Sequence, residues 1–147
     1  MAYFQNPEVT FEVPDDWVDQ TAVVYAERAV KGLPATISLV RTPIPASDTL
    51  RARATAVTRK LVAELPEAKI LEENWLVINT VPAVQLLAEW KHPAGPMMQL
   101  ITLFVREGTF WSFTATVPSE RLAHVDPIFQ GVLVSLRITK PQEPEER

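Results

Sequence analysis

Thirteen prolines, against only four glycines, interrupt this chain of 147 residues and limit the length of every regular element. Proline lacks a backbone N–H and is excluded from the interiors of helices and of central strands. The stretches between the prolines must therefore hold the secondary structure. A chain of this length is typical of one domain, and it buries enough surface to fold without disulfides or a structural metal.

Most of these stretches have the pattern of strands. In residues 9–13, for example, Val9, Phe11 and Val13 alternate with polar residues, which indicates a half-buried strand. Glu107-Gly108 separates two such stretches and is a typical two-residue hairpin signal. The predicted strands span residues 9–13, 21–27, 35–41, 69–80 (one or two strands), 83–91, 97–106 and 109–117.

Two other stretches have the spacing of amphipathic helices. In the first, Asp48 or Ser47 is the expected N-cap and Pro66 ends the helix. Its apolar stripe is Leu50, Ala54, Val57, Leu61 and Leu65. In the second, we expect Asp126 as the cap and Pro127 at the first helical position. Its apolar face is Ile128, Phe129, Val132, Leu133 and Leu136.

The order of these elements is strands, a helix, strands and a second helix. This order predicts an α+β fold with a mostly antiparallel sheet of six or seven strands and two main helices. Residues 140–147 are charged and interrupted by proline, and we expect them to form a disordered acidic tail. The single domain is therefore predicted to cover residues 1–139.

The residue types that carry common chemistry are scarce. The absence of cysteine excludes disulfides, thiol nucleophiles and thiolate-bound metals. The two histidines, His92 and His124, have no neighbouring group that would mark a catalytic residue, and we interpret both as surface residues. No glycine-rich phosphate loop or Ser-His-Asp order is present. We expect no enzymatic activity, no catalytic residue, no cofactor and no metal.

Charge and hydropathy restrict the partners and the location. The net charge of -4 argues against nucleic acid, whose binding sites need clustered Lys and Arg. The chain has no run of about 18 apolar residues, so we expect no direct membrane insertion. Residues 1–10 lack the basic and apolar regions of a signal peptide, which predicts a cytoplasmic protein.

In four of the predicted strands, at residues 21–27, 35–41, 97–106 and 109–117, the face opposite the helices carries almost no charge. Alternation separates them into two sets, because neighbouring side chains of a strand point to opposite faces. The set expected beneath the helices is Val23, Tyr25, Ile37, Leu39, Ile101, Leu103, Val105, Trp111 and Phe113. The opposite set is Ala22, Val24, Thr36, Ser38, Val40, Leu100, Thr102, Phe104, Ser112 and Thr114. Small, apolar and hydroxyl side chains suit an apolar helix from another chain, although further helices or a dimer partner would explain them equally.

These residues also carry a resemblance to a known family. The run from Phe11 to Trp17, FEVPDDW, followed by Asp19-Gln20-Thr21, resembles the opening motif of DcrB-related domains. It is most similar to the Eag-type chaperones of type VI secretion effectors. Further similar segments follow in order along the chain: residues 38–41, 65–66, 81–83 and 134–137.

The resemblance implies a PsbP-like α/β sandwich. It also implies a cytoplasmic homodimer that binds and shields the hydrophobic, transmembrane-like N-terminal helices of an effector of the PAAR or Rhs type. Such a chaperone aids loading of the effector onto the secretion spike. The alternative is a PsbP-like, non-catalytic interaction domain that serves another protein complex.

The family's client-binding positions match Ala22, Val24, Thr36 and Ser38 in this sequence. Together with the uncharged strand face, the resemblance gives the complete set of predicted effector-helix-binding residues. This set is Ala22, Val24, Thr36, Ser38, Val40, Thr102 and Phe104.

Overall fold

The structure is a computed structural model that describes residues 2–5, 10–17, 22–28 and 31–136. The strands are β1 (Ala2–Gln5), β2 (Thr10–Val13), β3 (Ala22–Ala26), β4 (Thr36–Pro43), β5 (Lys69–Ile78), β6 (Val81–His92), β7 (Gly95–Arg106) and β8 (Thr109–Pro118). The helices are α1 (Leu50–Glu64), the short 3-10 helix η1 (Ser119–Arg121) and α2 (Leu122–Ser135).

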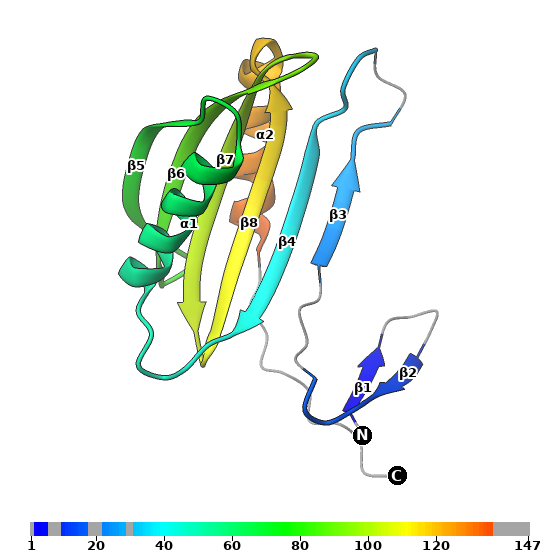
Figure 1. Ribbon diagram of the computed structural model, residues 1–147, viewed down its shortest axis with the longest axis vertical. Coiled ribbons are helices and arrows are strands. Elements are labelled where there is room, and N and C mark those ends of the chain that lie inside the picture. Colours follow the sequence, from blue (N-terminus) through cyan, green and yellow to red (C-terminus); the bar gives the residue numbers. More distant parts are fainter. Residues whose placement is uncertain (1, 6–9, 18–21, 29–30, 137–147) are drawn as a thin grey trace.

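Six of the strands form one antiparallel sheet in the order β3-β4-β8-β7-β6-β5. The strands from β5 to β8 follow one another through tight turns, and β4 then pairs with β8, which places β3 at one edge and β5 at the other. This arrangement confirms the predicted α+β fold and its antiparallel sheet. The four-residue strand β1 was not predicted. It pairs only with β2, and the hairpin of the two lies beyond the end of β3 that begins at Ala22 (Figure 1).

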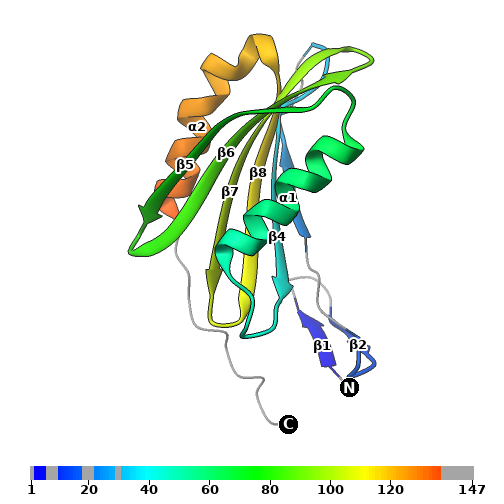
Figure 2. The ribbon, with the colours of Figure 1, turned by 60° about the vertical axis from the view of Figure 1, so that its left-hand side comes forward.

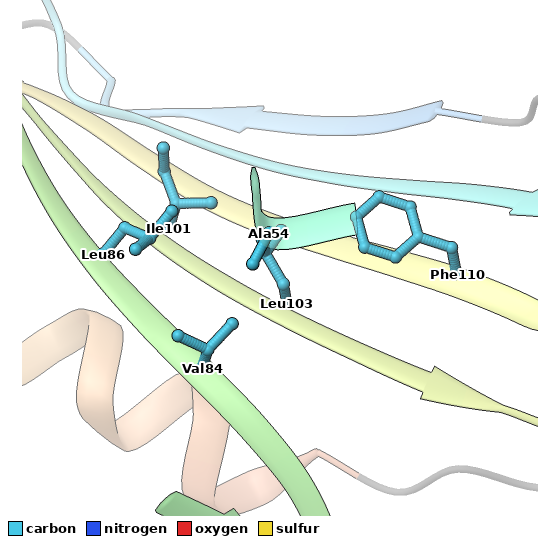
Figure 3. Close-up of a cluster of buried hydrophobic side chains, with 6 residues drawn as sticks. All are labelled: Ala54, Val84, Leu86, Ile101, Leu103 and Phe110. Carbon is cyan, nitrogen blue, oxygen red and sulfur yellow. The ribbon is translucent and has the colours of Figure 1, made fainter. Parts of the chain in front are cut away.

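The helix α1 covers one face of the sheet over β6, β7 and the start of β8. Its Ala54 is buried against Leu103 and Phe110 in the cluster shown in Figure 3. The other buried members of this cluster are Val84, Leu86 and Ile101. Leu50, Val57 and Leu61, which belong to the predicted apolar stripe, pack around it.

The helix α2 covers the opposite face (Figure 1, Figure 2). Phe129 and Leu133 pack there with Phe113 and Ala115 of β8, and the Phe113 and Phe129 rings lie 5.7 Å apart. The expectation that both helices cover the same face is therefore wrong. Alternate residues of β7 are apolar on both sides, so that the central part of the sheet can bury both faces, one beneath each helix.

The structure also corrects two helix starts. The N-cap of α1 is Thr49, whose hydroxyl accepts a hydrogen bond from the Ala52 N–H at 3.1 Å, while Asp48 instead pairs with Arg53. The helix α2 begins at Leu122, and Pro127 lies inside it rather than at its first position. The predicted tail at residues 140–147 lies outside the described ranges.

Candidate functional site

The part of the sheet that α1 leaves uncovered lies over β3, β4 and β8. In the register of these strands, Ala22 lies opposite Val40, which lies opposite Ser112, and residues paired in this way project to one face. The pairing with β7 shows which face this is: Ser112 lies opposite Leu103, a residue that α1 buries. We call this surface the open face. It consists of Ala22, Val24, Ala26, Thr36, Ser38, Val40, Ser112, Thr114 and Thr116.

None of the nine residues of the open face is charged. Five carry hydroxyl groups and the other four are alanine or valine. The three β3 residues are exposed, and the six on β4 and β8 are half-buried. The solvent-exposed face of an antiparallel sheet usually carries polar and charged residues. An uncharged face of this size is more typical of a surface that contacts a partner or another part of the chain.

The border between the open face and α1 contains a hollow of about 180 Å³. Gln99 of β7 lines it and lies directly opposite Thr116 in the sheet, so the hollow continues the open face toward the helix. The other lining residues are Val57, Lys60, Leu61, Glu64 and Leu65. Charged side chains therefore occur at the helix border of the open face and not within it.

Five of the seven predicted binding residues lie together on the open face: Ala22, Val24, Thr36, Ser38 and Val40. The sequence grouping missed Ala26 and Thr116, although each lies two residues beyond a member of that group and therefore on the same side of its strand.

The placement of Thr102 and Phe104 on this face was wrong. They lie opposite Phe113 and Trp111 on the face that α2 covers, and their exposed fractions are 0% and 2%. The phase assigned to β7 was shifted by one residue, which moves every side chain to the other face. Ile101 and Leu103 instead lie on the same side of the sheet as the open face, where α1 buries them.

Thr102 and Phe104 instead belong to the core. The Gln85 side-chain amide donates to the Thr102 hydroxyl at 3.3 Å and to the side-chain oxygen Oε1 of Gln130 in α2 at 3.4 Å. The Phe104 ring stacks on Trp111, with the ring centres 5.9 Å apart. Both residues therefore help to fix the layer between the sheet and α2, and neither is accessible to a partner.

An ion pair fastens the end of the edge strand β3 to the body of the protein. Both carboxylate oxygens of Glu27, the residue after β3, accept hydrogen bonds from the Arg121 guanidinium of η1. One of them also accepts from the Ala35 N–H at 2.7 Å. The hydrogen bonds from Arg121 and then from Ala35 lower the pKa of Glu27 from 4.5 to about 2. We call this arrangement the Glu27–Arg121 clasp.

The opposite edge of the sheet also exposes apolar side chains. Trp75 and Val77 of β5 are exposed, and the Arg51 guanidinium of α1 lies 4.9 Å from the centre of the Trp75 ring. Val77 is 64% exposed, nearly the same as Val24 at 63%. The two valines therefore provide a matched pair for experiments on the two edges.

Within the described parts of the chain, no three His, Asp or Glu side chains lie close enough to hold a metal ion. No helix in those parts is long and apolar enough to cross a membrane.

Comparisons with solved structures place this fold among known ones. PA94 of Pseudomonas aeruginosa, described as a putative regulator of unknown function, superposes with a TM-score of 0.79 at 20% identity, over 97% of this chain and 99% of that one. The PsbP protein CyanoP of Synechocystis sp. PCC 6803 superposes with a TM-score of 0.57 at 11% identity, over 94% of this chain and 92% of that one. LpqN of Mycobacterium tuberculosis, involved in cell envelope biogenesis, superposes with a TM-score of 0.57 at 15% identity, over 85% of this chain and 79% of that one.

These likenesses confirm the predicted PsbP-like α/β sandwich. No curated protein matches the sequence. The model of the DcrB family, however, matches residues 8–135, which include the whole six-stranded sheet and both helices. The chain therefore belongs to the DcrB family.

Proposed function

We propose that this protein is a cytoplasmic chaperone that binds the hydrophobic N-terminal helices of a type VI secretion effector. The observation that carries the proposal is the open face, a surface of nine side chains on three strands without a charge. The resemblance of the FEVPDDW motif and of the later segments to Eag-type chaperones gives the class of client. By shielding these helices in water, the protein would keep the effector soluble until it is loaded onto the secretion spike.

The chemistry of the open face suits an apolar helix. Alanine, serine and threonine are small, so a helix backbone can approach the strands closely, and their hydroxyls can bond to it without a buried charge. Burial of roughly 600 Å² of apolar client surface would contribute about 15 kcal/mol before the costs of association. These costs are several kcal/mol or more, so the difference supports a stable complex.

A matched pair of charge substitutions tests this proposal. Val24→Asp places a carboxylate in the open face, and Val77→Asp places one at an equally exposed valine on the opposite edge. Each variant is co-expressed with the N-terminal apolar segment of an effector of the PAAR or Rhs type that is encoded beside it. We expect Val24→Asp to abolish co-purification of the segment and Val77→Asp to retain it, with both variants folded by circular dichroism. Equal recovery with both variants would refute the assignment of the open face.

A second candidate function is a non-catalytic interaction domain that serves another protein complex. It is favoured by the fold itself, which this chain shares with CyanoP and with the envelope-biogenesis protein LpqN. Affinity capture from native extract separates the two candidates. A partner that lacks an apolar N-terminal segment, and whose capture does not depend on Val24, would favour the second.

A further inference from the structure

The hollow beside α1 lies next to the last row of residues on the open face. This row begins at Ala26, the last residue of β3, which lies opposite Thr36. Thr36 lies opposite Thr116 of β8, and Thr116 lies opposite Gln99 of β7. Residues paired in this way project to one face, so Gln99 extends this row by one strand. A partner bound along the row therefore reaches the hollow at the end of the open face.

The hollow has an apolar lining and the size of one aromatic ring. Its aliphatic side chains are Val57 and Leu61 of α1 and Leu65, the C-cap of that helix. Each of the three is half-buried, so part of its apolar surface is accessible. The volume of about 180 Å³ slightly exceeds the ~150 Å³ of an apolar cavity that takes up benzene. A whole helix is about 10–12 Å across and does not fit.

Gln99 adds one polar side chain to this apolar lining. Its side-chain amide forms no hydrogen bond with any other described residue, whereas Gln85 on the opposite face bonds to both Thr102 and Gln130. A glutamine side chain offers two N–H donors and an oxygen that can accept two hydrogen bonds. Because Gln99 is half-buried, a partner that fills the hollow must form a hydrogen bond with this amide or leave it unsatisfied.

We propose that the hollow binds a tryptophan or tyrosine side chain of the client, whose N–H or O–H group donates to the side-chain oxygen of Gln99. These two side chains combine an aromatic ring with a polar group, which matches an apolar hollow that contains one amide. Both are also enriched at the ends of membrane-spanning helices, where the apolar stretch stops. The class of client rests on the proposed function. The hollow adds the type of residue that is recognised at the end of the client helix.

The charges around the hollow fit the end of an apolar helix rather than its middle. Lys60 and Glu64 line the α1 side of the hollow, and both are exposed. The open face itself has no charged residue. The apolar middle of a client helix therefore suits the open face, and its end, where polar residues begin, suits the hollow. Aromatic side chains that fill such pockets often contribute a large share of the binding energy, so we expect this residue to anchor the client.

Fluorine NMR with fluoroindole, which represents the tryptophan side chain, tests the hollow without a client. Two variants of α1 receive the same substitution. Val57→Phe fills part of the hollow, whereas Val62→Phe changes an exposed residue that does not line it. We expect saturable binding at roughly millimolar concentration to the native chain and to Val62→Phe, and at least about tenfold weaker binding to Val57→Phe. Equal binding to the two folded variants, or no saturable binding to the native chain, would overturn the proposal.

The substitution Gln99→Leu tests the hydrogen bond. It should weaken the binding of fluoroindole about two- to tenfold, the usual range for one hydrogen bond. It should leave the binding of fluorobenzene unchanged, because this probe fits the apolar lining but has no N–H group. An equal effect on both probes, or no effect on fluoroindole, would contradict the role of Gln99.

The client segment of the Val24→Asp experiment separates this inference from the proposed function. Replacing the tryptophan and tyrosine residues at the ends of its apolar helices by leucine keeps the helices apolar. We expect its affinity for the native chain to fall at least about tenfold, and its affinity for Val57→Phe to change little. If Val24→Asp abolished binding but these replacements had no effect, or if the segment had no such residue, the hollow assignment would fall alone. If fluoroindole bound but no client segment did, the chaperone proposal would fall alone.

Discussion

Replacing Glu27 by glutamine should loosen the fastening of β3 without removing its shape. Glutamine retains one oxygen, which can accept from the Ala35 N–H, but its NH2 group cannot accept from Arg121. The substitution therefore removes the charge and one of the two hydrogen bonds from the Arg121 guanidinium. The decrease in the pKa of Glu27 from 4.5 to about 2 corresponds to at most about 3 kcal/mol of folding free energy. About a quarter of each side chain is exposed, which screens the pair. We therefore expect a loss of about 1–2 kcal/mol at pH 7.

The pH dependence gives a sharper test than the magnitude. A carboxylate whose pKa is lower in the folded state stabilises the protein above its unfolded pKa, and this contribution disappears as the pH falls through the folded pKa. The difference in unfolding free energy between the native chain and Glu27→Gln should be constant above pH ~5.5 and should shrink below 4.5. It should be small at pH 2 and vanish below it. Urea unfolding followed by tryptophan fluorescence, at equal protein concentrations, measures it.

The ion pair between Glu67 and Lys91 provides the control. Its atoms are 2.7 Å apart, close enough for a salt bridge, but both side chains are mostly exposed, at 63% and 67%. Its hydrogen bond also lowers the pKa of Glu67. We expect Glu67→Gln to have no measurable effect, since exposed pairs contribute little. If Glu27→Gln also had no measurable effect, or if its effect were unchanged at pH 3, the charge of Glu27 would not stabilise the folded state.

Three further substitutions test the core and the turns, each by urea unfolding at pH 7. Phe104→Ala should cost about 3–5 kcal/mol, because the ring is buried beneath α2 and not on the open face. Thr49→Ala should cost about 1 kcal/mol, because it removes the side-chain cap of α1, whereas Ser47→Ala should have no comparable effect. Gly108→Ala should cost about 1 kcal/mol, because its φ of +74° in the β7–β8 turn is strained for any residue with a Cβ.

The alternation of side chains separated the two faces of β3, β4 and β8 correctly but failed for β7. In β3 the expected cover is absent: Val23 and Tyr25, expected beneath the helices, are 42% and 73% exposed. In β4, one face is Thr36, Ser38 and Val40 and the other is mainly large and apolar, so the two sets differ and the grouping is clear. In β7, residues 100–104 are nearly all apolar and most are buried on both faces. A strand that is covered by a helix on each face has apolar residues on both sides, so its sequence does not show which residues share a face. The error for Thr102 and Phe104 follows from this lack of contrast.

The positions of the helices were less predictable than their existence. The apolar stripe of α1 predicted the residues that it buries, but an apolar stripe carries no information on which side of the sheet it will pack. The side is set by the connections: α1 links β4 to the distant edge strand β5, and α2 follows directly from β8 through η1. Pro127 also misplaced the start of α2, because the helix begins at Leu122 and continues through Pro127, although proline lacks the N–H of a regular helical turn.

The strand β3 carries three residues of the open face and is followed directly by Glu27, one partner of the Glu27–Arg121 clasp. Among the described strands it pairs only with β4, and the clasp gives its end a further attachment to η1. Loosening β3 should therefore disturb the open face without changing any of its side chains, whereas Val24→Asp places a charge within it. A client defect that appears in Glu27→Gln with a folded core would mean that the position of β3, and not only its side chains, is part of the binding surface.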